Sequence, residues 1–175
     1  MTNFLIRLFD LLFALCGLIL LSPLFIFMAV WIKADSQGPV FYRQIRVGKE
    51  QKDFKLFKFR SMRVDAHKYG QITVGARDPR VTNAGQFIRR FKLDEFPQLI
   101  NVLKGEMSLV GPRPEVRKYV DMYTPDQLRK VLSVKPGITD FASIEYSDES
   151  TLLSKASDPE DFYIREIMPA KIALN

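Results

Sequence analysis

The chain is poor in the residues that usually mark a disulfide or a metal site. Its 175 residues include one cysteine, one histidine and one tryptophan. Cys16 has no partner for an internal disulfide, which is typical of a reducing compartment, and we expect it to be a small apolar residue of a helix. His67 has no second histidine or cysteine at metal-ligand spacing, so we expect a surface residue and no zinc site. The sequence also lacks a P-loop and a GxGxxG motif, which excludes those two modes of nucleotide binding.

Charge is scarce at the amino terminus and uneven after it. Residues 1–32 carry one cation, Arg7, and one anion, Asp10. Residues 33–135 carry 22 Lys and Arg against 11 Asp and Glu, whereas residues 136–175 carry 3 against 8. The basic centre predicts an anionic partner such as phosphate groups, nucleic acid or anionic lipid headgroups.

Uncharged residues run without interruption over positions 11–32. A straight helix of that length would cover about 33 Å, close to the thickness of the hydrocarbon core of a bilayer. A cleaved signal peptide fits less well, because Asp10 precedes the run, the run is long, and no small-x-small site follows it. Trp31 and Lys33 are typical of an anchor at a membrane interface. We therefore predict that residues 1–33 associate with a membrane.

Ser22 and Pro23 interrupt the middle of this run. Proline removes a backbone donor and clashes with the preceding turn, and in lipid a nearby serine hydroxyl can help to repair that loss. These residues leave two outcomes open: a mildly kinked helix that spans the bilayer, or a helix that breaks and returns to the face it entered. Most Lys and Arg follow the run, so the globular part is expected to be cytoplasmic.

Residues 34–175 are typical of one domain of α+β class. Aromatic, β-branched and basic residues over 40–48 and 53–62 predict a β-hairpin. The remaining predicted elements are a polar loop over 64–75, a helix over 84–94, a helix over 97–104 that is ended by Gly105, amphipathic helices over 115–134 with a break at 124–126, a short strand after 135, and a last helix that starts at 158–160.

Two adjacent acids, Asp94 and Glu95, directly follow Arg89, Arg90 and Lys92. The cations and the start of the next helix should favour the ionised carboxylate and lower its pKa. Arg90 and Asp94 are four residues apart and would share a face if the first helix persists. An ionised carboxylate can attack phosphorus or hold a Mg²⁺ ion that is also bound by substrate phosphates. A solvated acidic pair is the alternative.

Arg113 lies between Pro112 and Pro114. The two prolines fix the backbone and lower the entropy cost of aiming a guanidinium, a group that binds phosphate with two parallel hydrogen bonds. The alternative is an ordinary surface turn. The residues alone leave phosphate chemistry and this alternative equally open, and they identify no reaction.

Several long motifs stand in the order of one bacterial family. They are the apolar segment with its Ser-Pro pair, GPVFYRQIRVG, FKLFKFRSM, DPRVTNAGQFIRR, LDEFPQLINVLKGEMSLVGPRPE and VKPGITD. Together they resemble the bacterial sugar transferase family, the monotopic phosphoglycosyl transferases that start lipid-linked glycan assembly for O-antigen, capsule or exopolysaccharide. The resemblance covers most of the chain.

The resemblance implies a reaction and a set of site residues. A phosphosugar would pass from a UDP-sugar to undecaprenyl phosphate, with release of UMP. Asp94 would be the nucleophile and form a covalent aspartyl-phosphosugar intermediate, and Glu95 would assist with metal or proton handling, with Mg²⁺ as the cofactor. The donor phosphates would be bound by Arg89, Arg113, Arg80, Lys58 and Arg60.

The resemblance also implies a place in the cell. The break at Ser22 and Pro23 would make a re-entrant helix hairpin with both ends on the cytoplasmic face of the bacterial inner membrane, in contact with membrane lipids. A homodimer is compatible with the family. Many relatives continue after VKPGIT with Gly-Trp and a Gln-Val-Asn-Gly-like stretch and extend past the position of Asn175. Here DFASIEYSDES stands in that region, which is expected to touch sugar or uridine, so the identity of the sugar does not carry over.

Two further classes compete with this interpretation. A membrane-anchored binding protein without enzymatic activity could hold anionic lipid or nucleic acid through the basic centre, although no nucleic-acid recognition motif accompanies the charge. A transferase that moves a sugar without its phosphate would release UDP in place of UMP.

Overall fold

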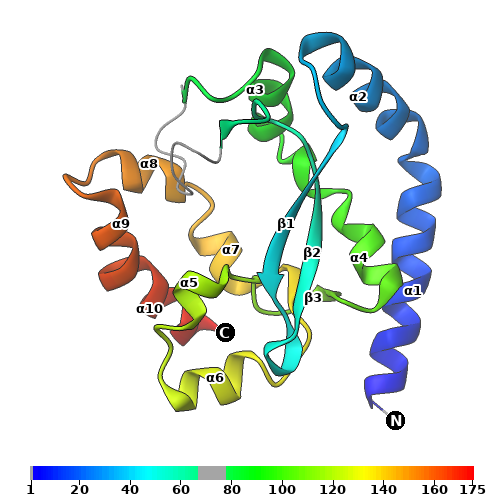
Figure 1. Cartoon of the computed structure of the whole chain (residues 1–175). Coiled ribbons are helices and arrows are strands. Elements are labelled where there is room, and N and C mark those ends of the chain that lie inside the picture. The colour runs from blue at the N-terminus through cyan, green and yellow to red at the C-terminus, as the bar shows by residue number, and fades with distance from the viewer. Residues whose placement is uncertain (1, 67–77) are drawn as a thin grey trace.

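The computed structural model describes residues 2–66 and 78–175 as a mixed arrangement of helices and short strands (Figure 1). The helices are α1 (Thr2–Leu20), α2 (Ser22–Asp35), α3 (Asn83–Arg90), α4 (Gln98–Lys104), α5 (Arg117–Val120), α6 (Pro125–Val131), α7 (Phe141–Glu145), α8 (Glu149–Ser154), α9 (Pro159–Phe162) and α10 (Met168–Leu174). The strands are β1 (Phe41–Val47), β2 (Asp53–Phe59), β3 (Ser108–Val110) and β4 (Gly137–Thr139). Three further helical turns are η1 (Lys49–Gln51), η3 (Leu93–Glu95) and the π-helical η4 (Tyr163–Ile167). His67 and most of the predicted loop around it lie outside the described residues.

The apolar run forms two helices that are bent by 60° where α1 gives way to α2. Pro23 occupies the first turn of α2, where its missing N–H costs no hydrogen bond. The Ser22 hydroxyl donates to the carbonyl of Ile19 at 2.8 Å, as expected for a serine beside a helix break. No single helix of the described residues is long and apolar enough to cross a bilayer, but the bent pair together satisfies both criteria.

Large apolar side chains cover the outer surface of this helix pair. Phe4 is 70% exposed, Leu20 80% and Ile26 67%. Phe9, Leu12, Phe13, Ile19, Phe27 and Val30 are exposed as well. Soluble proteins rarely expose a contiguous apolar surface of this extent, which is typical of contact with lipid or with another protein.

The one cation of α1 faces the rest of the protein. Arg7 donates from Nη1 to the carbonyl of Val102 at 2.6 Å and from Nη2 to that of Leu103 at 2.9 Å. These carbonyls belong to the last turn of α4, where a helix runs short of N–H donors, although the N–H of Gly105 also donates to Val102. Arg7 therefore caps α4 from outside and complements the negative end of its dipole.

The one anion of α1 faces the same way. Asp10 is only 5% exposed, and its carboxylate accepts from the Ser108 hydroxyl at 2.8 Å and from the Leu109 backbone N–H at 2.9 Å. A buried carboxylate is stable in a fold only where such donors meet it. Arg7 and Asp10 thus fix α1 against α4 and β3 through polar contacts.

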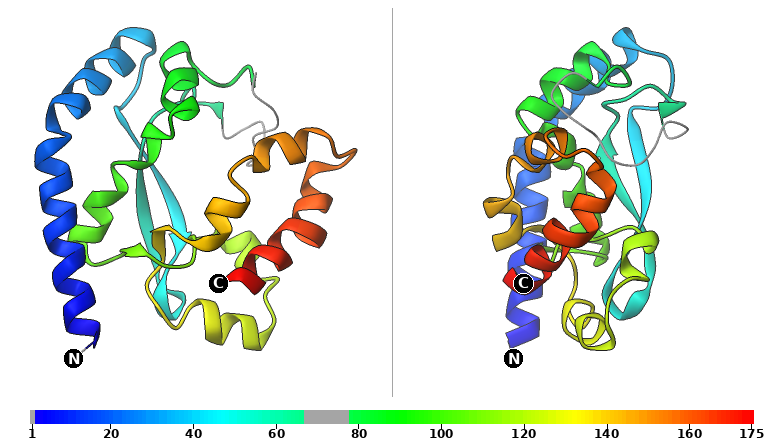
Figure 2. Two further views of the ribbon diagram at one scale, coloured as in Figure 1. Left: turned by 180° about the vertical axis from the view of Figure 1, so that it is seen from behind. Right: turned by 90° about the vertical axis from the view of Figure 1, so that its left-hand side faces the viewer.

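β1 and β2 form the predicted antiparallel hairpin, in register from Phe41 opposite Phe59 to Val47 opposite Asp53. α1 and α4 lie on one side of this ribbon, and α5 and α8–α10 lie on the other, as Figures 1 and 2 both show. A second, two-stranded sheet pairs β3 with β4 in parallel. The short strand predicted after residue 135 is therefore confirmed.

Three buried clusters form the core. The first joins α5, α8, η4 and α10 through Val116, Tyr119, Leu153, Tyr163, Ile167 and Met168. The second contains Ala14, Phe54, Leu56, Val102 and Met107, and the third Met28, Ile32, Phe59, Ala84 and Ile88. Since α1 and α2 contribute to the last two clusters, the helix pair packs on the domain that follows. The division into residues 1–33 and 34–175 stays a prediction.

The helix predicted over 84–94 is shorter than expected. α3 ends at Arg90, and Lys92 takes a left-handed conformation with φ 54°. Arg90 and Asp94 therefore do not share a helix face, which corrects the prediction. The next helix is confirmed: Pro97 immediately precedes α4, and Gly105 ends it at φ 82°.

Replacing Asp10 with Ala should destabilise the protein, because the change strips two buried donors of their acceptor. The expected loss is about 1–3 kcal/mol, or several degrees in Tm for a chain of this size. Thermal unfolding in detergent would measure it. Asp121, which is exposed on the globular part, provides the matched Asp→Ala control. A Tm equal to that of the control would contradict the anchoring role of Asp10.

Candidate active site

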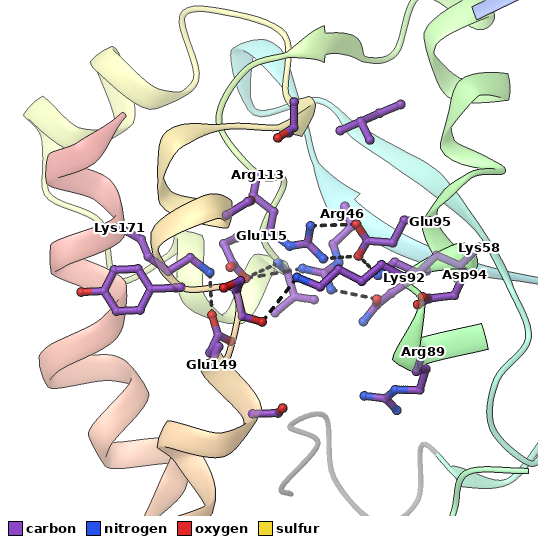
Figure 3. A pocket seen from close by; sticks show the side chains of 18 of the residues that line it. Arg46, Lys58, Arg89, Lys92, Asp94, Glu95, Arg113, Glu115, Glu149 and Lys171 are labelled. Atoms are coloured by element: carbon purple, nitrogen blue, oxygen red, sulfur yellow. Dashed lines mark hydrogen bonds and ion pairs between the residues drawn. The ribbon is translucent and has the colours of Figure 1, made fainter. Parts of the chain in front are cut away.

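A cavity of about 700 Å³ lies between the β1–β2 ribbon and the helices of the carboxyl-terminal part (Figure 3). Its catalytic side, as we define it, is formed by Arg46, Lys58, Arg89, Lys92, Asp94, Glu95 and Arg113. Its far wall is formed by side chains of α7, α8 and η4 together with Lys171 of α10. The cavity therefore brings both predicted acids together with three of the predicted phosphate-binding cations.

Local geometry presents the acid pair to the cavity. The chain turns away from α3 at Lys92, which has a left-handed conformation. The short turn η3 follows; it contains Asp94 and Glu95 and lies just before α4. Neighbouring residues of such a turn do not face the same way. The two carboxylates therefore have different surroundings.

Glu95 is held between two cations from distant parts of the chain. Lys58 of β2 donates to Oε1 at 2.9 Å, and Arg113 donates to Oε2 at 3.1 Å and also to Oε1. Burial alone would raise the pKa of Glu95, but the charges of Lys58 and Arg113 outweigh it and hold that pKa well below its ordinary value. Glu95 is therefore a fixed anion.

Asp94 makes no ion pair within the described residues. Burial raises the pKa of its carboxyl above the ordinary value, although Lys58 and Arg89 oppose that rise. The sequence predicted the opposite direction for the acid pair, and the prediction is wrong for Asp94 because desolvation exceeds the attraction of the nearby cations. The pair thus divides into one paired anion and one carboxyl without a salt bridge.

A hydrogen bond of its backbone N–H fixes Arg113 in addition to the two flanking prolines. Its N–H donates to Oδ2 of Asp140 at 2.9 Å, and Oδ1 of Asp140 accepts from the N–H of Ser143 at 2.6 Å. Asp140 is the N-cap of α7. Burial opposes ionisation of Asp140, but these hydrogen bonds outweigh it and lower its pKa. One carboxylate therefore fixes both the Arg113 loop and the start of the far wall.

A second link joins the Arg113 loop to the carboxyl-terminal helices. Tyr163 donates its hydroxyl to Oε1 of Glu115 at 2.6 Å, and Arg46 donates to the carbonyl of Pro114 at 2.9 Å. Glu115 and Arg46 also form an ion pair at 3.5 Å. Tyr163 lies in the π-helical turn η4, a feature that is frequent at functional sites.

Two predicted phosphate-binding residues lie outside the cavity. Arg60 follows β2 and donates to the carbonyls of Ile32 at 3.2 Å and Ser36 at 2.7 Å, so it closes the end of α2. Arg80 pairs with Asp78, its Nε lying 2.9 Å from Oδ1. The structure therefore brings together Asp94, Glu95, Lys58, Arg89 and Arg113 and leaves Arg60 and Arg80 elsewhere.

Several residues at the site were not among the predicted site residues. Those that line the cavity are Arg46, Lys92, Glu115, Glu149, Tyr163 and Lys171, and Asp140 binds the backbone of Arg113. Asp140 carried a signal, because it stands at the end of VKPGITD and before a helix, where Asp is a favoured N-cap. Glu149 and Lys171 are 22 residues apart and belong to no motif, so only the fold shows that they meet.

The two carboxylates of the acid pair fit Mg²⁺ binding that a substrate completes. Within residues 2–66 and 78–175 there is no cluster of three or more His, Cys, Asp or Glu able to hold a metal ion. Mg²⁺, however, is commonly held by one or two carboxylates together with substrate phosphates and water. Asp94 and Glu95 match that mode, with the phosphates supplied by a substrate.

Neutral variants of the two acids should change stability in opposite directions. Glu95→Gln leaves Lys58 and Arg113 without their counter-charge. It should lower the free energy of unfolding by about 1–3 kcal/mol at pH 7, a modest loss because all three side chains are partly exposed to water. Asp94→Asn removes a carboxylate that burial disfavours, so its Tm should equal or exceed that of the wild type. Thermal unfolding of both variants is the measurement. A lower Tm for Asp94→Asn than for Glu95→Gln would contradict the assignment.

The stability gap between wild type and Glu95→Gln should depend on pH. A carboxyl with a lowered pKa in the folded state stabilises fully above its unfolded pKa of about 4.3 and loses that effect as the pH falls. The gap should be constant near neutrality and narrow below about pH 4. Tm measured against pH tests this, and a gap that stays constant down to pH 3 would exclude the ion pairs as its source.

Residues 1–171 match the family model described as Bacterial sugar transferase. A UDP-N-acetylgalactosamine-undecaprenyl-phosphate N-acetylgalactosaminephosphotransferase of Aeromonas hydrophila is 44% identical over 138 residues, which are 77% of this chain and 32% of that protein. A UDP-glucose:undecaprenyl-phosphate glucose-1-phosphate transferase of Escherichia coli (strain K12) is 42% identical over 165 residues, 90% of this chain and 35% of that protein.

A Bacillus subtilis (strain 168) protein, whose name points to N-acetylgalactosaminyl 1-phosphate transfer to undecaprenyl phosphate, is 51% identical over 109 residues, 62% of this chain and 61% of its own length. The chain thus spans between about a third and three fifths of these relatives. The family model covers nearly all of the chain, from the bent helix pair to α10, and the protein therefore belongs to the bacterial sugar transferase family.

Proposed function

We propose that this protein is a membrane phosphoglycosyl transferase that moves a sugar 1-phosphate from a UDP-sugar to undecaprenyl phosphate and releases UMP. The observation that carries the proposal is the placement of Asp94, which has no salt bridge among the described residues, in one cavity with Lys58, Arg89 and Arg113. A carboxylate beside several phosphate-binding cations is suited to attack on phosphorus. The names of the relatives support the lipid acceptor and the sugar-nucleotide donor.

The first half of the reaction forms a covalent enzyme. An oxygen of ionised Asp94 attacks the phosphorus that carries the sugar, and a new O–P bond forms. The bond from that phosphorus to the bridging oxygen of the diphosphate breaks, and UMP leaves with the bonding electrons. Lys58 and Arg89 favour the ionised nucleophile, since both lower the pKa of Asp94 against the effect of burial.

The second half of the reaction transfers the phosphosugar to lipid. A phosphate oxygen of undecaprenyl phosphate attacks the same phosphorus, the bond to Asp94 breaks, and the carboxylate is restored. The product carries a diphosphate between lipid and sugar, so the number of phosphoanhydride bonds is unchanged. Arg113, fixed through its backbone by Asp140, is placed to hold phosphate oxygens through both steps.

Asp94 and Glu95 are the residues that would hold Mg²⁺, which when bound neutralises charge on the donor diphosphate. Both oxygens of Glu95 accept hydrogen bonds from Lys58 or Arg113. These cations must turn from Glu95 to the donor phosphates before Glu95 can serve as a ligand. The ion pairs with Glu95 therefore keep both cations beside the place where the donor phosphates would bind.

The bent helix pair would enter one leaflet of the bacterial inner membrane and return to the cytoplasmic face. The 60° bend at Ser22 and Pro23 and the exposed apolar side chains of α1 and α2 support this re-entrant course. Asp10 ties the hairpin to β3, and Arg7 ties it to α4, which begins just after the acid pair. This arrangement would keep Asp94 near the headgroups, where the lipid phosphate and the cytosolic donor can both reach it.

The donor is a UDP-hexose or a UDP-N-acetylhexosamine, as in the relatives named for glucose and for N-acetylgalactosamine. The product would begin a lipid-linked polysaccharide.

Asp94→Asn should abolish UMP formation, by more than a thousandfold, because the amide is not a competent nucleophile. Wild-type protein with UDP-sugar, Mg²⁺ and undecaprenyl phosphate should release UMP in turnover. Without lipid it should give a burst of at most one UMP per enzyme, and mass spectrometry should find the phosphosugar on Asp94. UDP as the product would indicate sugar transfer without phosphate. Full UMP turnover by Asp94→Asn would overturn the covalent mechanism.

Removal of divalent ions should suppress UMP release at least tenfold, since Asp94 and the donor diphosphate would then face each other without charge neutralisation. Treatment with EDTA followed by addition of Mg²⁺ tests this on one sample, and activity should return. Undiminished activity in excess EDTA would exclude a required divalent ion.

A further inference from the structure

The far wall of the cavity carries an ion pair that the proposed chemistry does not use. Glu149 at the start of α8 accepts from Lys171 of α10, with 2.8 Å between Oε2 and Nζ. Both side chains line the cavity. In Figure 3 they lie across the cavity from Asp94 and Arg89.

Lys171 is a buried ion-pair partner of the Glu149 carboxylate. It is 9% exposed, and its ammonium lies 5.9 Å from the centre of the Tyr163 ring, which is within the range of a cation–π contact. A buried lysine needs a counter-charge, and Glu149 supplies it. The pair therefore fixes the position of Glu149.

One oxygen of Glu149 is left for a ligand. Its carboxylate accepts a single hydrogen bond from the described residues, at Oε2, and its side chain keeps 30% of its surface exposed on the cavity. A carboxylate that served only to tie α8 to α10 would have no reason to face a cavity of this size. An ionised carboxylate with a vacant oxygen is a strong acceptor for hydroxyl groups.

The wall also lies close to the reacting centre. Lys92 donates to the carbonyl of Ser147 at 3.4 Å. Along the chain, Asp94 is two residues from Lys92 and Glu149 is two residues from Ser147, so this contact brings the two acids near each other. The charge of Glu149 also reaches Arg113, whose pKa it helps to raise. Phosphate bound at Arg113 would place the groups attached to that phosphate between Arg113 and the far wall.

We propose that Glu149, held by Lys171, binds neighbouring ring hydroxyls of the UDP-sugar donor. This inference rests on the proposed function and adds a donor-recognition residue to it. The shared chemistry is a pair of neighbouring hydroxyls, which occurs both in the ribose of the nucleotide and in the hexose.

The experiment compares wild type with Glu149→Gln in UMP release at saturating undecaprenyl phosphate. Donors are UDP-glucose, UDP-galactose, UDP-GlcNAc, UDP-GalNAc and the 2′-deoxyuridine form of the donor that the wild type prefers. Glu149→Gln should raise KM for that donor about tenfold to a hundredfold, the range for loss of a hydrogen bond to a charged group. The burst amplitude at saturating donor should be unchanged.

Two control variants separate recognition from structure. Glu145→Gln makes the same change on an exposed glutamate of the adjacent α7 and should behave as wild type. Glu149→Gln/Lys171→Gln removes both charges, so that no unpaired ammonium is left in the wall, and should keep the raised KM. A smaller burst amplitude and a lower Tm with an unchanged KM would show that the ion pair serves folding. That result would overturn the proposal.

The donor panel distinguishes the two sources of hydroxyls. A loss that differs between UDP-glucose and UDP-galactose, or between the two N-acetylhexosamines, assigns Glu149 to the hexose. An equal loss for all sugars that disappears with the 2′-deoxy donor assigns it to the ribose. Wild-type kinetics in Glu149→Gln with every donor would overturn the inference while leaving the transferase activity established. Absence of UMP from wild type with every donor would instead count against the proposed function itself.

Discussion

Two cations and one carboxylate, Lys58, Glu95 and Arg113, meet in the cavity from three segments that are distant in the chain. Lys58 stands near the end of β2, Glu95 in the turn before α4, and Arg113 in the loop after β3. Without the carboxylate, two positive side chains would face each other in a site that is partly closed to water, which is costly at low dielectric. The closeness of these three segments, and therefore the shape of the catalytic side, depends on that single negative charge.

The same arrangement explains why two adjacent acids can differ so much. Glu95 takes both cations, and Asp94 then remains partly buried with its charge only partly compensated. One acid is thereby held in place by two ion pairs, and the other has none among the described residues. Neighbouring positions in a short turn make this possible, because their side chains leave the backbone in different directions.

Sequence patterns gave the elements whose signals are local. Aromatic and β-branched residues indicated the hairpin, and Pro97 and Gly105 marked the limits of α4. The end of α3 was missed because the left-handed residue is a lysine. A glycine at this position would have indicated a left-handed conformation, but a lysine does not. The direction of the Asp94 pKa was missed because charge can be read from a sequence, whereas desolvation depends on what covers the group.

Contacts between distant residues were the least predictable part of the site. Arg7 and Asp10 appeared in the sequence as isolated charges before an apolar run, yet they fix α1 to α4 and β3. Arg60 appeared to belong with Lys58, but it lies just beyond the end of β2 and turns toward α2. In each case the deciding partner is more than twenty residues away and has no fixed spacing.

Polar side-chain contacts join the far wall to the rest of the cavity. Tyr163 binds Glu115, Asn175 donates to Asp140 at 2.9 Å, and Lys92 reaches Ser147. A chimera that exchanged the segment after Asp140 between relatives would need to preserve these junction residues. It would also need the Lys118–Glu160 ion pair and the buried cluster in which Val116 and Tyr119 pack on the carboxyl-terminal helices. Under the proposed function, such an exchange would change the recognition of the donor while Asp94 and its neighbouring cations stay in place.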